Sequence, residues 1–93
     1  MRRELLRSSA FVRAARRLVK KDPSAAEGLR TALERLAEDA FHPSLRTHKL
    51  KGRFAGVWAC TAGYDLRILF EFVEEGGTEA ILLLTVGTHD EVY

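Results

Sequence analysis

The chain has 93 residues, of which 46% are hydrophobic and 30% are charged, enough for one two-layer domain over residues 1–93 and too few for two. No apolar run approaches the roughly 20 residues that span a bilayer, and no apolar segment with a cleavage site follows the basic N-terminus. The single cysteine, Cys60, excludes an internal disulfide, and zinc-type spacing of cysteine and histidine is missing, so we expect a cytoplasmic protein without metal or membrane contact.

The formal net charge of +2 conceals an asymmetry along the chain. Residues 1–53 carry 14 of the 15 lysines and arginines against six acids, whereas residues 54–93 carry seven acids and one arginine, Arg67. Charge separated in this way favours an anionic partner along one surface. Simple solvation of two basic helices explains the same pattern equally well.

Two helices are predicted first. Apolar residues recur at helical spacing from Phe11 to Val19, after the candidate N-caps Ser8 and Ser9. Proline 23 ends this helix, and residues 24–27 have the pattern of a capping box that opens a second apolar stripe over residues 25–40. The short link predicts an antiparallel helical hairpin, and residues 3–6 are a candidate edge strand.

The second half of the chain predicts strands. Residues 57–61 form a short one, residues 64–74 alternate between apolar and polar, and residues 79–86 return after a hairpin turn at residues 75–78. We therefore expect an α+β fold in which the N-terminal helical hairpin packs on one face of a small, mainly antiparallel sheet of three to four strands.

The opposite face of the sheet carries the first candidate site. Alternation places Asp65 and Arg67 on the same face, uncovered by the helices. A carboxylate and a guanidinium placed together there suit a functional site, and a cross-strand ion pair of little energetic value is the alternative.

A basic loop adds further candidates. Cations that suit a phosphodiester backbone crowd around a histidine that can transfer a proton near neutral pH; they are Arg46, His48, Lys49, Lys51 and Arg53. A basic loop alone is usually just solvated. His42 is interpreted as a helix-end residue and Cys60 as a buried structural thiol.

The C-terminal segment supplies another histidine and an aromatic ring, His89 and Tyr93, directly after an apolar strand. RNA cleavage without a metal needs a base, an acid and a cation for the developing phosphorane charge. His48 and His89 suit the acid and base roles, Arg67 or Lys51 suits the third, and Tyr93 suits base stacking. No glycine-rich phosphate loop, nucleophile elbow or HExxH pattern suggests another enzyme class or a cofactor.

Four runs carry a resemblance to a known family: HKLKG at residues 48–52, GVW at 56–58, YDLRILF at 64–70 and VGTHDEVY at 86–93. Together they resemble the RelE/ParE toxin superfamily, and most closely its YafQ-like branch. The resemblance implies a toxin of a type II toxin–antitoxin system, a ribosome-dependent mRNA endonuclease that inhibits translation. The implied partners are the ribosome with its mRNA and a cognate antitoxin in a hetero-oligomer.

The resemblance also implies roles for single residues. His48, Asp65, His89 and Tyr93 match the catalytic positions of the YafQ-like branch, and Arg67 matches the strand arginine of the RelE branch. Three departures are evident. A further YafQ-like histidine falls on Thr61, the paired lysines of the RelE branch fall on Trp58 and Cys60, and the C-terminal helix of some relatives is not expected here.

Two other interpretations remain open at this point. One is a non-catalytic gyrase inhibitor like the ParE branch, although that branch lacks the histidine set. The other is a degenerate toxin that only binds its antitoxin, because the Thr61 position lacks the imidazole.

Overall fold

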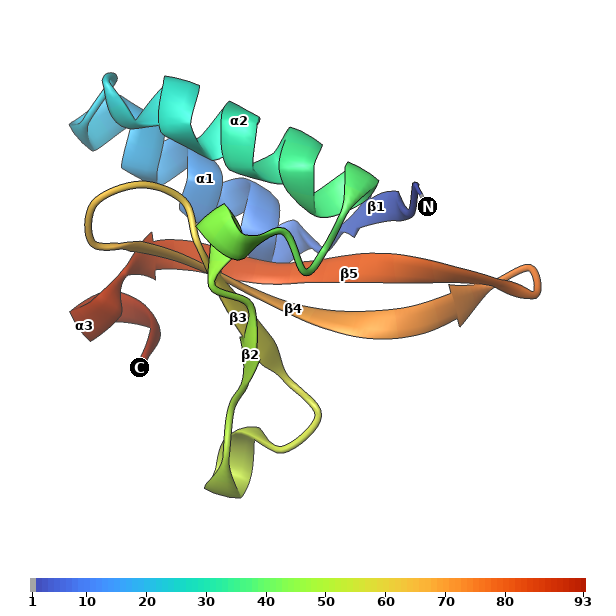
Figure 1. Cartoon of the computed structure of the whole chain (residues 1–93). Coiled ribbons are helices and arrows are strands. Elements are labelled where there is room, and N and C mark those ends of the chain that lie inside the picture. Colours follow the sequence, from blue (N-terminus) through green and yellow to red (C-terminus); the bar gives the residue numbers. More distant parts are fainter. Residues whose placement is uncertain (1) are drawn as a thin grey trace.

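The computed structural model describes residues 2–93 except for the side chain of Arg53, so the RNA-binding role expected of that side chain lies outside the described residues (Figure 1). The elements are β1 (Glu4–Arg7), α1 (Ser9–Lys21), α2 (Ala25–Glu38), η1 (Pro43–Leu45), β2 (His48–Lys49), η2 (Gly52–Phe54), β3 (Trp58–Thr61), β4 (Leu66–Glu75), β5 (Thr78–Thr88) and α3 (His89–Val92), where η marks a 3₁₀ turn. Among these residues no helix is long and apolar enough to cross a membrane.

The described strands form one sheet in the order β1-β5-β4-β3-β2. β1 pairs with β5 in parallel, and the other pairs are antiparallel. The helices α1 and α2 lie together over one face (Figure 1). This arrangement confirms the predicted α+β fold, with five strands in place of three to four. The additional strand is β2, whose two residues are too few to show alternation in the sequence.

The start of α1 follows the prediction and the start of α2 does not. Ser8 caps α1, because its Oγ accepts a hydrogen bond from the Phe11 N–H at 3.0 Å. The predicted capping box at Ser24 is wrong. Ser24 has helical φ and ψ of −67° and −19° and makes no cap bond, and its Oγ donates to Asp22 Oδ1 at 2.6 Å.

The core lies between the helices and the covered face of β4 and β5. Leu66, Ile68, Phe70 and Phe72 alternate onto this face as expected. They meet buried side chains of both helices, and each large apolar side chain buried here stabilises the fold by about 1.5–3 kcal/mol. The largest fully buried side chains are Phe70, Leu36, Leu45, Ile68, Ile81, Leu83 and Cys60.

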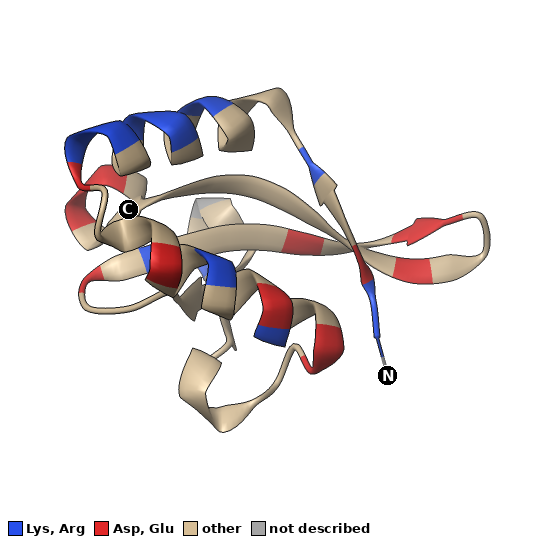
Figure 2. Cartoon of the chain, turned by 90° about the horizontal axis from the view of Figure 1, so that it is seen from above, with Lys and Arg blue, Asp and Glu red and all other residues tan. Residues whose placement is uncertain are grey.

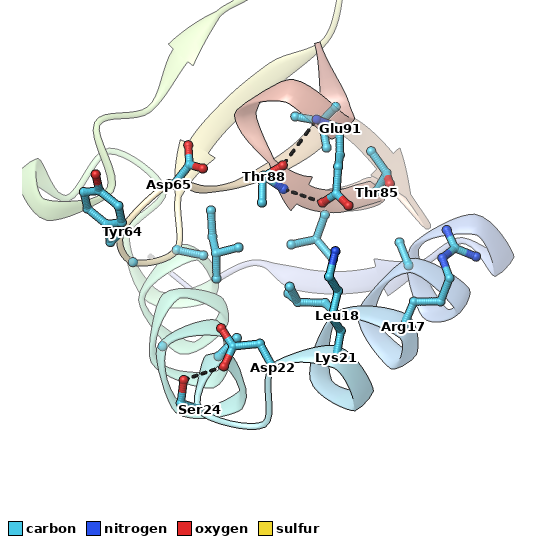
Figure 3. Close-up of a pocket in the computed structure, with 18 residues that line it drawn as sticks. Arg17, Leu18, Lys21, Asp22, Ser24, Tyr64, Asp65, Thr85, Thr88 and Glu91 are labelled. Atoms are coloured by element: carbon cyan, nitrogen blue, oxygen red, sulfur yellow. Dashed lines mark hydrogen bonds between the residues drawn. The ribbon is translucent and has the colours of Figure 1, made fainter.

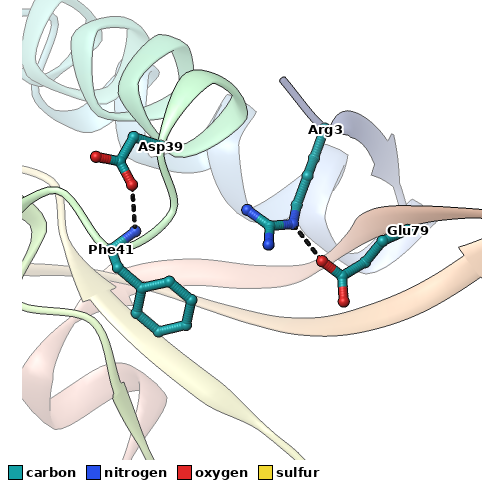
Figure 4. A network of polar contacts seen from close by, with 4 residues as sticks. All are labelled: Arg3, Asp39, Phe41 and Glu79. Carbon is teal, nitrogen blue, oxygen red and sulfur yellow. Dashed lines mark hydrogen bonds and ion pairs between the residues drawn. The ribbon is translucent and has the colours of Figure 1, made fainter. Parts of the chain in front are cut away.

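An aromatic cluster lies at the edge of this core. Phe41 stacks on Phe72 at 5.8 Å between ring centroids and meets Trp58 edge to face at 5.6 Å. Arg3 lies over the Phe72 ring at 5.2 Å and donates through Nε to Glu79 Oε1 at 2.6 Å, which ties β1 to the start of β5 (Figure 4).

The two ends of β5 are set by local sequence. Gly76 and Gly77 connect β4 to β5 with positive φ values of 60° and 81°, the geometry that a two-residue type I′ hairpin requires. At its other end β5 runs directly into α3, a single helical turn. The expectation of a chain without any C-terminal helix is therefore wrong, and the reason is a capping box at Thr88.

Candidate functional site

Arg67 is the centre of the candidate site. It lies near the start of β4, opposite Thr61 of β3 and Gly87 of β5. Alternation directs its Cβ to the face opposite the helices, and at this end of the sheet the residue also lines a cavity beside α2. Nη1 donates to the Leu66 carbonyl oxygen at 3.0 Å. No described carboxylate lies within 4.0 Å of the guanidinium. The alternative of an ion pair with Asp65 is therefore not realised, and the charge remains available to a ligand.

Gly87 allows α3 to fold back beside Arg67. A Cβ at this position would lie 2.9 Å from Glu91 Oε1 and 3.2 Å from Val92 Cγ1. A side chain here would push α3 away from the end of the strand. The glycine is therefore needed for close approach, since only it leaves the space empty.

A capping box holds α3 in this position. The Thr88 N–H donates to Glu91 Oε1 at 2.8 Å, and the Glu91 N–H donates back to Thr88 Oγ1 at 3.4 Å. The bond from the Thr88 backbone lowers the pKa of Glu91, and the positive charges of Lys21 and Arg17 lower it further. Figure 3 shows Lys21 extending from α1 toward this carboxylate. The T-x-x-E spacing of Thr88 and Glu91 is the sequence signal for this capping box, which was not among the predictions.

His89 and Tyr93 meet across this turn. Their rings lie edge to face with centroids 4.5 Å apart. The His89 side chain is 57% exposed, and Tyr93 is 37% exposed. Partial burial raises the pKa of the Tyr93 phenol, against the opposing effect of the nearby Arg67 charge. Three of the predicted residues, Arg67, His89 and Tyr93, therefore share one corner of the sheet.

His48 lies farther along the same face. It pairs with Ala59 of β3, which is two residues before Thr61. His48 and Arg67 are therefore two inter-strand spacings and two residues apart, roughly 12 Å between Cα atoms. Its Nδ1 lies 2.9 Å from the Arg46 carbonyl oxygen. Because a carbonyl only accepts, Nδ1 carries the hydrogen, and in the neutral ring Nε2 keeps a free lone pair.

The other basic-loop residues divide between the faces. Lys49 alternates to the covered side, where Nζ lies 5.5 Å from the Trp58 ring centroid. Arg46 is exposed and has a left-handed φ of 51°, and Lys51 is exposed before η2. Trp58 and Cys60 also face the helices. The positions matched to the paired lysines of the RelE branch therefore do not reach the face that carries Arg67.

Asp65 does not lie in the strand. It occupies the turn before β4 with a left-handed φ of 59°, which breaks the alternation on which its predicted placement beside Arg67 depended. Asp65 is exposed at the rim of a cavity of about 840 Å³ that is bounded by α1, α2 and the β5–α3 junction (Figure 3). It contacts neither histidine of the predicted set through a hydrogen bond or ion pair.

Charge is distributed as the sequence asymmetry suggests. Figure 2 shows a row of basic residues along α1 and acidic residues at the far end of the β4–β5 hairpin and on α3. The acidic α3 lies beside the basic end of α1, which agrees with the influence of Arg17 and Lys21 on Glu91. The molecule is therefore a helical hairpin over a mixed sheet, with a basic helix and a corner formed by an imidazole, a guanidinium and a phenol.

The chain belongs to the YafQ family of toxins. The family model described as "Bacterial toxin of type II toxin-antitoxin system, YafQ" matches residues 3–93. The protein is therefore a toxin of a type II toxin–antitoxin system. Compared by sequence with curated proteins, the chain matches none.

Solved structures with the same fold include several toxins. YafQ from E. coli strain BL21(DE3) superimposes with a TM-score of 0.78 at 14% identity, covering 98% of each chain. The YoeB/ParE toxin from Agrobacterium tumefaciens gives 0.75 at 15% identity, covering 92% of this chain and 98% of that one. A metal-bound toxin from Helicobacter pylori gives 0.76 at 22% identity over 100% of both chains. At these identities the likeness establishes the fold.

Proposed function

We propose that this toxin is a ribosome-dependent mRNA endonuclease that cleaves RNA by acid–base chemistry without a metal and so inhibits translation in the cytoplasm. The observation that carries the proposal is the corner where Arg67, free of any described carboxylate within 4.0 Å, lies beside the His89–Tyr93 pair. A guanidinium suits the charge that develops on phosphorus, and an imidazole suits proton transfer.

In the proposed reaction His48 is the base. Its Nε2 lone pair takes the proton of the ribose 2′-OH while the 2′-oxygen attacks phosphorus. Arg67 stabilises the negative charge of the phosphorane. The bond from phosphorus to the 5′-oxygen breaks, His89 donates a proton to that oxygen, and the products are a 2′,3′-cyclic phosphate and a 5′-OH. Tyr93 stacks a base, and Asp65 orients the substrate from the turn before β4.

RNA contacts outside this centre are assigned to the basic loop. Arg46 and Lys51 are exposed and suit phosphate contacts on either side of His48. Lys49 suits a contact at the sheet edge, and Arg53 is proposed from the sequence alone.

A cognate antitoxin is the proposed protein partner, in a hetero-oligomer that neutralises the toxin. Support comes from the E. coli DinJ–YafQ toxin–antitoxin complex, whose matched chain has the same fold, with a TM-score of 0.76 at 15% identity over 100% of this chain and 99% of that one. The basic outer face of α1 suits an acidic partner segment.

The test is induced expression in growing bacteria with primer extension on translated messages. We expect growth arrest and new 5′ ends in messages that are being translated, and loss of both in His89→Ala. Glu74→Gln is the matched control, because it neutralises an exposed acid near the far end of β4. Asp90 is unsuitable, since its Oδ1 lies 3.7 Å from His89 Nδ1. Full toxicity of a folded His89→Ala variant would contradict the catalytic assignment. Arrest with intact messages and inhibited DNA supercoiling would favour the gyrase-inhibitor alternative.

A further inference from the structure

A second cavity, of about 700 Å³, lies where α2, η1 and the β3–β4 loop meet. Three arginines line it, each from a different part of the chain. Arg35 belongs to α2, Arg46 follows η1, and Arg67 belongs to β4. Thr31, Ser44 and Thr61 also line it.

None of the three arginines has a carboxylate partner among the described residues within 4.0 Å. Two acids do line the cavity. Glu27 is occupied, because its carboxylate binds Arg30 at 2.7 Å. Asp65 remains at the rim. Among the residues that line the cavity, three arginines therefore stand against one carboxylate without an ion pair, and this positive excess favours an anion.

A chain of hydrogen bonds orients Arg35. The Ser44 N–H lies 3.1 Å from His42 Nδ1 and donates to it, so Nδ1 is an acceptor. Ser44 Oγ, at 2.8 Å from the same nitrogen, therefore also donates to it. The oxygen in turn accepts from Arg35 Nη1 at 3.0 Å. One donor of the guanidinium is fixed in this way, and its remaining N–H donors stay available.

Arg46 is held from its backbone. Its carbonyl oxygen accepts the His48 ring hydrogen, and the next residue, Thr47, donates through Oγ1 to the Ala40 carbonyl oxygen at 2.6 Å. The left-handed φ of 51° at Arg46 costs free energy for a residue with a side chain. The flanking bonds hold this conformation, and Arg46 lines the cavity.

We infer that this cavity binds a backbone phosphate of RNA next to the one that is cleaved. The inference rests on the proposed function and extends it, because Arg67 lines the cavity and also borders the corner with His89 and Tyr93. Arginine is suited to phosphate through parallel N–H bonds. Arg35 becomes an RNA-positioning residue on the helical layer, contributed by an element that carries none of the predicted site residues.

The test measures binding in two arms. One uses a 2′-O-methyl RNA oligonucleotide, which lacks the attacking hydroxyl, and the other uses ribosomes with an empty A site. We expect Arg35→Ala to weaken binding by about tenfold in the oligonucleotide arm. The slope of log affinity against log salt should fall by about 0.7 for the oligonucleotide, as for one lost phosphate contact. Arg35→Lys should retain the slope and lose part of the affinity.

Arg30→Ala is the matched control, because it removes an arginine from the same helix outside this cavity, where Glu27 already pairs with it. It should bind RNA like the unchanged protein. Melting temperatures of all variants are compared first, and Ser44→Ala serves as a second variant that releases Arg35 without removing its charge.

Each outcome decides the inference. Weaker oligonucleotide binding supports the inference, because it assigns the phosphate to the cleaved RNA. Weaker ribosome binding alone would assign the phosphate to ribosomal RNA and overturn its placement beside the cleaved one. Unchanged RNA binding in both arms overturns the inference, and so does a loss confined to antitoxin binding, which would assign the cavity to protein carboxylates. Failure of the unchanged toxin to cut translated mRNA contradicts the proposed function alone, since both arms measure binding without cleavage.

Discussion

Gly87 lies directly opposite Arg67 in the β4–β5 ladder, at the point where α3 folds back over the end of β5. We expect Gly87→Ala to displace α3, because the new Cβ would lie 3.2 Å from Glu91 Cβ and from Val92 Cγ1. A shift of α3 by a few tenths of an ångström relieves these contacts, so His89 moves slightly and cleavage is expected to fall by about tenfold or less. The free energy of unfolding should fall by less than about 1 kcal/mol, since α3 contains no buried residue.

The displacement is measured by NMR, through the ring-current shifts that His89 and Tyr93 impose on each other. Thr88→Ser, which keeps the hydroxyl of the capping box, is the control. Unchanged ring shifts and full cleavage in Gly87→Ala would show that α3 does not need the close approach.

The capping box makes α3 sensitive to acid. The bond from the Thr88 N–H lowers the pKa of Glu91 below its ordinary value of 4.5. A carboxyl whose pKa is lower in the folded state stabilises that state above its unfolded pKa, and the stabilisation is lost as pH falls through the folded pKa. We therefore expect α3 to be formed at pH 6 and to open as the pH falls below 4.5 and through the lowered pKa of Glu91. The Thr88 amide shift follows this opening. Glu91→Gln should remove this titration, and an unchanged pH profile in that variant would contradict the assignment.

Tyr93 is expected to act through its ring rather than its hydroxyl. Partial burial raises the pKa of the phenol above its ordinary value of 10, so it stays neutral at physiological pH. Tyr93→Phe should keep cleavage within about threefold, whereas Tyr93→Ala loses the contact with His89 and any stacked base and should lose at least about tenfold. Equal losses in the two variants, measured by primer extension, would assign the role to the hydroxyl.

Much of the fold could be predicted because its periodicities are long. The helical stripe from Phe11 onward and the alternation of β4 each extend over several repeats, and Gly76-Gly77 is a strong turn signal. Shorter elements gave no such signal. β2 has only two residues. α3 is a single turn, and the apolar run up to Val86 that precedes it has the pattern of a strand.

The candidate site was predictable in composition and less so in geometry. Arg67, His89 and Tyr93 follow from the paired strands β4 and β5. Asp65 departs from the expected face because its own left-handed φ interrupts the alternation. A backbone angle of this kind cannot be read from the residue types alone. Arg35 gave no signal at all, since an exposed arginine on α2 looks like any solvated cation until η1 packs against it.

Thr61 provides a test of packing beside Arg67. Its Oγ1 is buried, and no described protein group lies within hydrogen-bond distance. A buried hydroxyl without a partner costs about 1–3 kcal/mol. Thr61→Val keeps the shape and removes that cost, so we expect the free energy of unfolding in urea to rise by about 1 kcal/mol. Thr85→Val, at a half-buried position of β5 whose hydroxyl is not both buried and unpaired, is the control. Destabilisation by Thr61→Val would show that the hydroxyl is hydrogen-bonded.

Cys60 should be chemically inert while the protein is folded. It is fully buried between the helices and the sheet, and burial raises the pKa of its thiol to about 12. At pH 7–9 the thiol is therefore protonated, and its burial also keeps reagents from reaching the sulfur. We expect no labelling by a charged disulfide reagent in native buffer and one label per chain in denaturant, both measured by mass spectrometry. Labelling of the native protein at the rate of a free thiol would contradict the placement of Cys60 on the covered face. Such labelling would mean that the Cys60 side chain lies on the face that carries Arg67.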